Sequence, residues 1–163
     1  MKYIDVEEFK HILNQDSIRL TEDLYVRSKG LFSDTVVYKY LQYFFTDYSH
    51  DIIKQTFSGS LDGNGHTVHL PRPLFFEITS DSSIEHIHFE FRSTVSESFI
   101  AATNYGELRD VSVSGDLANS EDINKSLGGI VGTNHNIMRN CSFSGKIRTF
   151  HNSDGSNMYR HTG

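Results

Sequence analysis

Six charged side chains in the middle of the chain are the first candidates for acid–base chemistry. They are Glu85, Glu90, Glu107, Arg109, Asp110 and Arg139. Hydrolysis of a glycosidic bond needs one carboxyl group as the general acid and a second as the base or nucleophile. Carboxylates clustered with a basic residue on one outer face would therefore indicate a glycan-cleaving enzyme.

The same residues also have a purely structural interpretation. Aligned on the repeats described below, four of them fall with His86 and Asn140 into rows that run from one repeat to the next. The first row is Glu85, Arg109 and Arg139, and the second row is His86, Asp110 and Asn140. Charges that alternate in sign along such a row stabilise stacked strands modestly. We favour the structural interpretation and predict no catalytic residues and no enzymatic activity.

Histidine is the second residue type that could do chemistry, because imidazole binds metal ions. Four of the nine histidines fall on neighbouring predicted strands, namely His66, His69, His86 and His88. His86 and His88 are two residues apart, so they would share one face of a regular strand and could hold zinc or copper. His88, however, takes the outward position that serine holds in the next two repeats, which a solvated polar row explains. We predict no metal site and no cofactor.

The Asp-Gly-Asn-Gly segment at 62–65 offers oxygen ligands that calcium or a carbohydrate could use. A tight turn explains it better, because glycine supplies positive φ and Asp or Asn bonds its own backbone. A calcium loop would also need further acidic ligands nearby. We therefore predict a turn at these residues.

The single cysteine and a group of paired serines are the last candidates for chemistry. Cys141 takes an inward position between Met138 and Phe143, so we interpret it as a small apolar filler and not as a nucleophile. The paired serines lack a histidine and an acid at triad spacing, so they predict a solvated sheet surface that could touch a ligand. These serines are Ser112, Ser114, Ser142 and Ser144.

Composition excludes several classes of protein. One cysteine in 163 residues permits neither an intrachain disulfide nor a thiolate zinc site. A net charge of −6 without a basic cluster disfavours a nucleic-acid partner. No apolar stretch approaches the roughly 20 residues that cross a bilayer, so we expect no membrane insertion. The opening segment lacks the apolar run of a secretory signal, which predicts a cytoplasmic location, or an extracellular one for a fragment of a longer parent.

The N-terminal region predicts a short helix followed by strands. Val6, Phe9, Ile12 and Leu13 share one helical face, and Asp5 with Glu8 has the spacing of an N-terminal cap. Strand-like alternation follows at Ile18, Leu20, Leu24 and Val26, broken by a turn at 21–23. The segment 36–48 fits either a helix or a strand.

Internal repeats dominate the sequence after Phe57. Residues 103–117, TNYGELRDVSVSGDL, align without a gap on residues 133–147, TNHNIMRNCSFSGKI, at an offset of 30. A third copy lies 24 residues upstream of the first. Its Phe75, Ile84, Ile87 and Phe89 match Phe99, Leu108, Val111 and Val113.

Each copy has the pattern of one rung in a stack of β-strands. Since side chains alternate along a strand, we predict that Val111, Val113, Cys141 and Phe143 are buried and that the paired serines face outward. A single rung cannot bury its apolar row alone, so the rungs must stack. We therefore predict an all-β parallel β-helix with a short N-terminal capping helix. Residues 1–163 form one domain, with a cap and irregular rungs at 1–56, repeat rungs at 57–147 and a tail at 148–163.

Two segments, Ser98–Gly115 and Gly128–Gly145, resemble the GLUG motif, whose pattern is Gly-Gly-aliphatic-Val-Gly, an Asn/Gly turn and an aliphatic-x-Asn-Cys-x-aliphatic-x-Gly strand. The segment Phe57–Val68 is similar to the Asp-Gly-Asn-Gly-His-Thr rung that precedes such repeats. The resemblance implies a right-handed, single-stranded β-helix. It also implies a relation to large bacterial surface and secreted proteins, where these repeats form stalks, adhesive surfaces or accessory regions.

Three functions are open at this point. The first is a non-enzymatic binding, adhesion or assembly module with a protein or glycan partner. The second is an accessory fragment of a glycan-active or peptidase surface protein, and the third is an intracellular acidic β-helix that binds and inhibits a protein. The expected binding face consists of Glu85, His86, His88, Arg109, Asp110, Ser112, Ser114, Arg139, Asn140, Ser142 and Ser144.

The C-terminal end predicts a further contact. Residues 148–163, RTFHNSDGSNMYRHTG, show no further apolar alternation and no capping helix. An uncovered final rung would expose backbone groups that template further pairing. We therefore expect either that the natural protein continues past Gly163 or that this rung makes an end-to-end or homo-oligomeric contact.

Overall fold

The computed structural model describes residues 1–28, 52–95, 97–119, 126–153 and 156–160. The segment 36–48, which the sequence left open between helix and strand, lies outside these residues. The described residues are mostly β-strand, with one short helix. That helix is far shorter than a membrane-crossing helix, and no other described segment forms one that could cross a bilayer.

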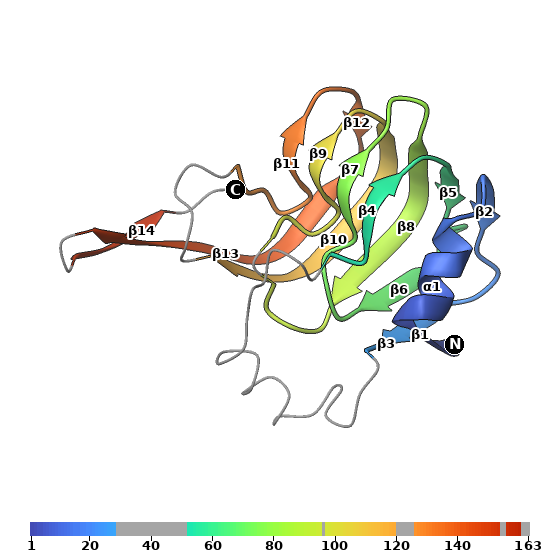
Figure 1. Ribbon diagram of the computed structural model, residues 1–163, viewed down its shortest axis with the longest axis horizontal. Helices are drawn as coiled ribbons and strands as arrows, with labels where there is room; N and C mark the ends of the chain where they lie inside the picture. Colours follow the sequence, from blue (N-terminus) through green and yellow to red (C-terminus); the bar gives the residue numbers. More distant parts are fainter. Residues whose placement is uncertain (29–51, 96, 120–125, 154–155, 161–163) are drawn as a thin grey trace.

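The chain begins with a capped helix, as the sequence predicted. Strand β1 (Lys2–Asp5) leads directly into α1 (Val6–Leu13). The side chain of Asp5 accepts a hydrogen bond from the backbone N–H of Glu8, which closes the first turn. The buried face of α1 packs against β1 and β3 (Leu24–Arg27), at one end of the stacked strands (Figure 1).

Two sheets of mainly parallel strands make up the body of the fold (Figure 1). The smaller sheet has the order β11-β9-β7-β4, and the larger has the order β1-β3-β6-β8-β10-β13-β14, with β2, β5 and β12 paired alongside. The strands of the smaller sheet are β4 (Lys54–Phe57), β7 (Phe75–Ile78), β9 (Ala101–Asn104) and β11 (Val131–Asn134). Those of the larger sheet are β2 (Ser17–Arg19), β5 (Ser60–Asp62), β6 (Thr67–Leu70), β8 (Ser83–Phe91), β10 (Glu107–Asn119), β12 (Met138–Arg139), β13 (Ser142–Ser153) and β14 (Ser156–Arg160).

From β4 onward the chain alternates between the two sheets. It passes from β4 to β5 and β6, back to β7, across to β8, and onward through β9, β10 and β11 to β12 and β13. Each return lays a strand parallel to the one before it in the same sheet. Residues 30 apart face each other between β10 and β13, as Val113 faces Phe143, and residues 24 apart face each other between β8 and β10, as Phe89 faces Val113. The repeat offsets predicted from the sequence are thus confirmed for this sheet.

One predicted match between repeats is wrong by two residues. Phe75 pairs with Ala101 and not with Phe99. The loop from β7 to β8 contains residues 79–82, whereas the loop from β9 to β10 contains only residues 105–106. An ungapped alignment therefore shifts β7 against β9 although it places β8 against β10 correctly.

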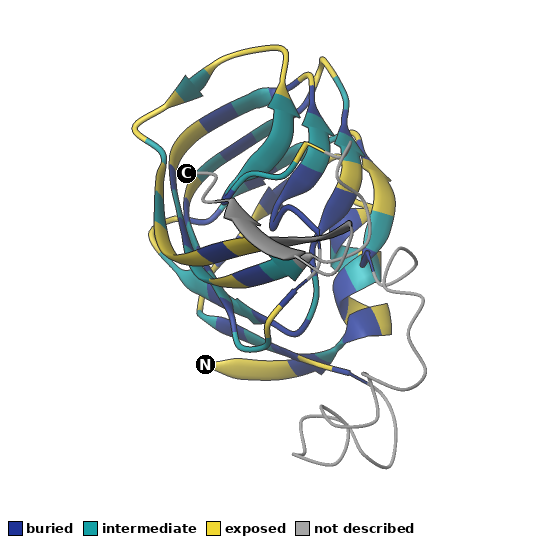
Figure 2. Cartoon of the chain, turned by 90° about the vertical axis from the view of Figure 1, so that its left-hand side faces the viewer, coloured by how far each residue is buried: buried dark blue, intermediate teal, exposed yellow. Residues whose placement is uncertain are grey.

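The core lies between the two sheets and is formed by their buried hydrophobic residues. Figure 2 shows buried residues along the strands of both sheets. Ile18, Leu20, Leu24 and Val26, which carry the strand-like alternation of the N-terminal region, are all buried. Val111 and Val113 are at most 1% exposed, whereas Ser112 and Ser114, which alternate with them along the strand, are only partly buried. The predicted alternation is therefore confirmed on β10.

The final rung differs from that prediction. Cys141 and Phe143 point toward the core but are only partly buried, while Ser142 and Ser144 are exposed. Phe143 stacks on Phe99, with ring centroids 5.6 Å apart. An inward side chain of an inner rung has neighbours on two sides, whereas Phe143 packs on the core from the last rung of the described stack.

The segment predicted as a tail carries a β-hairpin. Strand β13 runs on to Ser153 and pairs antiparallel with β14, and the hairpin projects away from the two sheets (Figure 1). The pairing covers only Thr149–Ser153. In the part of the chain that the structure describes, no strand lies along the outer edge of residues 142–148.

Candidate functional site

All eleven predicted face residues lie on the outside of β8, β10, β12 and β13 or at the bends within this part of the larger sheet. Each is exposed or partly buried. The strand register arranges most of them into rows that run across neighbouring strands. The structure therefore brings the predicted residues together on one side of the larger sheet, although the sheet bends between the rows.

The bend is produced by residues in the left-handed region of backbone conformation. The φ angles are 52° at Asn64, 51° at His86, 50° at Asp110 and 51° at Asn140. Asn, Asp and His tolerate this conformation better than most residues. At the bends of His86, Asp110 and Asn140 two consecutive residues face outward, as Glu85 and His86 do between the buried Ile84 and Ile87. His86 and His88 therefore do not share the face of a regular strand.

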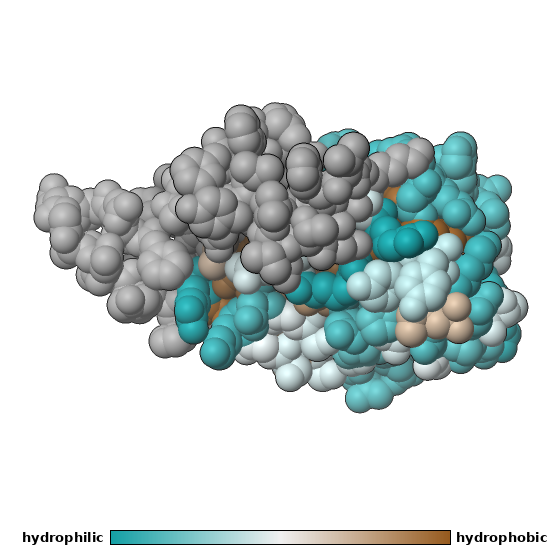
Figure 3. All heavy atoms as spheres, turned by 90° about the horizontal axis from the view of Figure 1, so that it is seen from below, coloured by the Kyte–Doolittle hydropathy of each residue, from teal (hydrophilic) through white to brown (hydrophobic). Residues whose placement is uncertain are grey.

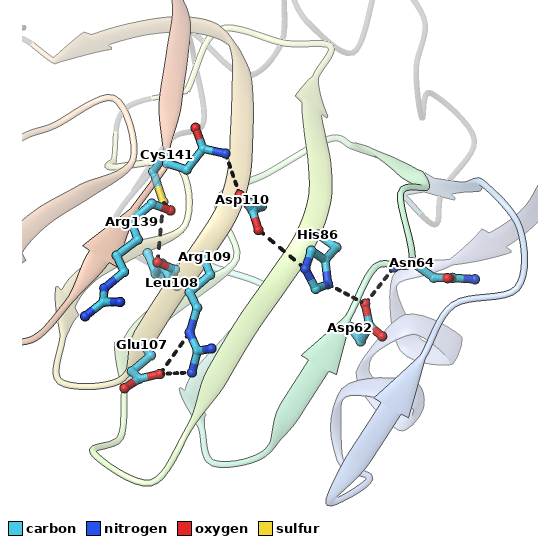
Figure 4. Close-up of polar contacts among 10 residues, drawn as sticks. Asp62, Asn64, His86, Glu107, Leu108, Arg109, Asp110, Arg139 and Cys141 are labelled. Carbon is cyan, nitrogen blue, oxygen red and sulfur yellow. Dashed lines mark hydrogen bonds and ion pairs between the residues drawn. The ribbon is translucent and has the colours of Figure 1, made fainter.

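Four side chains form a continuous polar chain along the bends, which we call the corner row: Asp62, His86, Asp110 and Asn140 (Figure 4). Nδ1 of His86 is 3.3 Å from Oδ1 of Asp62, and Nε2 is 3.4 Å from Oδ2 of Asp110. Asn140 donates through Nδ2 to Oδ1 of Asp110. The predicted stacking of His86, Asp110 and Asn140 is thus confirmed, and Asp62 extends the row by one strand.

Asp62 belongs to the turn that the sequence predicted. Its Oδ1 accepts a hydrogen bond from the backbone N–H of Asn64 at 2.9 Å. This bond, assisted by His86 and Arg19, lowers the pKa of the Asp62 carboxyl against the opposing effect of burial. Gly63 is required by packing, because a Cβ there would lie 2.4 Å from Cβ of Ile87.

The row beside the corner row consists of Glu85, Arg109 and Arg139, in register on β8, β10 and β12. Arg109 donates through Nε and a terminal nitrogen to one carboxylate oxygen of Glu107. This contact raises the pKa of the exposed Arg109 guanidinium. Glu107 is therefore paired with the guanidinium of Arg109.

Beyond the bend, His88 lies between two serines of β10. Its Nδ1 is 2.7 Å from Oγ of Ser112, and its Nε2 is 3.2 Å from Oγ of Ser114. A serine–imidazole contact is half of a nucleophilic site, but the second ring nitrogen must then meet a carboxylate that orients it. Here it meets a second serine. The repeats placed His88 in the row of Ser112 and Ser142, and its contact with Ser114 as well was not predicted.

The other two histidines of the predicted strands have separate acidic partners. His66 contacts Asp23 at 3.1 Å, and His69 contacts Glu90 at 3.1 Å. The pKa of Asp23 is lowered, first by the backbone N–H of Thr67 and then by His66. Among the described residues, one group brings three metal-binding side chains together, with ligand atoms of Asp62, Glu85 and His86 all within 4.8 Å of one another.

Two residues of the repeat have structural roles. Cys141 directs its Sγ toward backbone carbonyl groups, and burial raises the pKa of its thiol, as expected of a filler.

Asn104, which was not predicted as a site residue, is fully buried and bonds Gly106 through both its Oδ1 and its Nδ2. Its Nδ2 also donates to Oδ1 of Asn134 at 2.7 Å. The repeated Thr-Asn pairs at 103–104 and 133–134 were the signal for this contact.

Comparison with known proteins identifies one feature of the chain. Residues 123–148 match the GLUG motif, so the chain contains this motif in the region of β11, β12 and the first part of β13. Searches of curated proteins and of solved structures returned no match.

Proposed function

We propose that the chain is a right-handed parallel β-helix that works as a non-enzymatic binding module for a protein or glycan partner. The chain alternates between two sheets and lays each strand parallel to its predecessor in the same sheet, which supports the β-helix. Crossovers between parallel strands are right-handed in nearly all proteins, and the match of residues 123–148 to the GLUG motif agrees with stacked repeats.

The observation that carries the proposal is the ordered outer side of β8, β10, β12 and β13. Several of its side chains are held by contacts with neighbours in adjacent strands, so a partner would meet a surface that is already partly organised. The members of the corner row contact each other, and His88 contacts Ser112 and Ser114. A surface of this kind loses little side-chain entropy on binding.

The chemistry of the surface agrees with a polar recognition mode. Hydroxyl, amide, imidazole and charged groups alternate across the rows, and they supply donors and acceptors that a glycan or a polar protein surface can use. Figure 3 shows one face of the molecule, on which the described residues are mostly hydrophilic and the hydrophobic residues form small areas.

Binding to a glycan array and to proteins of the native host tests this proposal. Ser112→Lys and Ser142→Lys alter the outer row without replacing a buried side chain. Phe76→Lys is the matched control, because Phe76 is 51% exposed on β7 of the other sheet. We expect a glycan or purified protein whose binding falls at least tenfold in both serine variants and less than twofold in the control.

Equal binding by all four chains would refute the proposed face. Turnover of an arrayed polysaccharide that disappears in Glu107→Gln and Asp110→Asn would instead place the chain among the enzymes. Circular dichroism of each variant ensures that lost binding does not come from lost folding.

A further inference from the structure

His86 lies between two carboxylates, and a neutral imidazole cannot donate to both. Its two nitrogens are 3.3 Å from an oxygen of Asp62 and 3.4 Å from an oxygen of Asp110. A neutral ring carries a single N–H, so one nitrogen directs a lone pair toward a carboxylate oxygen. Two electron-rich atoms at this separation repel each other unless a proton or a metal ion lies between them.

The surroundings of Asp110 are compatible with a hydrogen on Nε2 of His86. Asn140 donates to Oδ1 of Asp110 and so orients the carboxylate, while Oδ2 faces Nε2 of His86. If Nε2–H donates to Oδ2, the lone pair of Nδ1 points toward Asp62. Histidines that bind metal ions have this arrangement, because their second nitrogen almost always donates to a carboxylate, carbonyl or water.

Glu85 lies beside Asp62 and His86 and offers a third metal-binding group. Asp62 and Glu85 face each other in the register of β5 and β8, so the backbone holds both carboxylates next to His86. Ligand atoms of the three residues lie within 4.8 Å of one another. Two ligands of a tetrahedral zinc ion, each about 2.0–2.1 Å from it, are separated by about 3.3 Å. The distance from Nδ1 of His86 to Oδ1 of Asp62 is 3.3 Å.

We propose that Asp62, Glu85 and His86 bind one transition-metal ion of the zinc class, with water completing the coordination. An imidazole ligand favours such ions over calcium and magnesium, which prefer oxygen. The N–H of Asn64 donates to Oδ1 of Asp62 at 2.9 Å and so holds this carboxylate in place. Arg19 contacts the other oxygen, Oδ2, at 3.6 Å through a side chain that is 69% exposed, so it can move as the ion binds. The site stands independently of the proposed partner binding.

Calorimetric titration of the full chain with Zn²⁺ tests the site. We expect one equivalent to bind, with the affinity falling at least tenfold in Asp62→Asn and in His86→Asn. Asparagine is chosen at position 86 because Asn140 occupies the equivalent left-handed position. The matched controls are His66→Asn and His88→Asn, which lie outside the group and should change the affinity less than twofold. An excess of Ca²⁺ should not compete.

Nitrogen-15 spectra of the imidazoles give a second readout that does not depend on variants. Coordination predicts that Zn²⁺ shifts Nδ1 of His86 while Nε2 keeps its hydrogen. The site is refuted if Zn²⁺ leaves His86 unchanged, if its ring carries hydrogens on both nitrogens in the presence of Zn²⁺, or if His86→Asn binds Zn²⁺ as the wild type does. Equal loss of binding in His88→Asn would also refute it.

Discussion

Phe75 and Phe76 provide the sharpest test of the packing, because they are neighbours on β7 with opposite environments. Phe75 is 0% exposed, and its ring stacks on that of Phe57 at 4.8 Å, whereas Phe76 is 51% exposed. Replacing a fully buried phenylalanine by alanine removes its transfer free energy and leaves a cavity, at a cost of about 3–5 kcal/mol. Phe76→Ala should change the free energy of unfolding by less than about 0.5 kcal/mol.

Equilibrium unfolding in urea measures both values on the same chain. The midpoint should fall in Phe75→Ala and stay near the wild type in Phe76→Ala, with the slope of the transition unchanged in both. In a thermal melt, the loss in Phe75→Ala corresponds to roughly 6–20 °C for a chain of this size. Equal effects of the two substitutions, or a larger effect of Phe76→Ala, would show that the register of β7 is wrong.

Three further outcomes are expected. Asn104→Ala should destabilise the fold by about 1–3 kcal/mol in urea unfolding, because it leaves buried partners of Asn104 unsatisfied; a loss as small as at a surface site would contradict that role. The pKa of Asp62 is lowered from 3.8 in the folded chain. The ionised carboxylate therefore stabilises the fold above pH 3.8, and this stabilisation is lost as the pH falls through the folded-state pKa. Wild type and Asp62→Asn should therefore differ in unfolding free energy at neutral pH and converge below about pH 4, and a constant difference would refute the linkage. Cys141 should react with a thiol reagent more slowly at pH 8 in the folded chain than in urea, because burial raises its pKa, and equal rates would contradict its inward position.

The sequence was sufficient for those parts of the fold that depend on local pattern. The capped helix at 6–13 follows from Asp5 and a periodic apolar face, and the register of β10 and β13 follows from the identical residues of the two repeats. The shifted partner of Phe75 was not predictable from an ungapped match. Loop length is only weakly constrained by energy, so neighbouring repeats can differ there without losing the stack.

The candidate site was predicted in composition but not in geometry. Strict alternation would place His86 and His88 on one face of a strand. The left-handed backbone at His86 bends the strand, so the two side chains do not share a face. The signal for the bend was present in the equivalent positions, since His86, Asp110 and Asn140 are all residue types that tolerate positive φ. The partial burial of Phe143 depends on how many neighbours its rung has, which a repeat pattern cannot state.

Cross-strand nuclear Overhauser effects test the central claim most directly, because the proposed binding face depends on rows of residues stacked at offsets of 24 and 30. The account predicts contacts between backbone protons of Val113 and Phe143 and between those of Phe89 and Val113, in the pattern of parallel strands. Contacts in an antiparallel pattern, or pairing shifted by one residue, would contradict it, since such a shift would turn the polar rows toward the core.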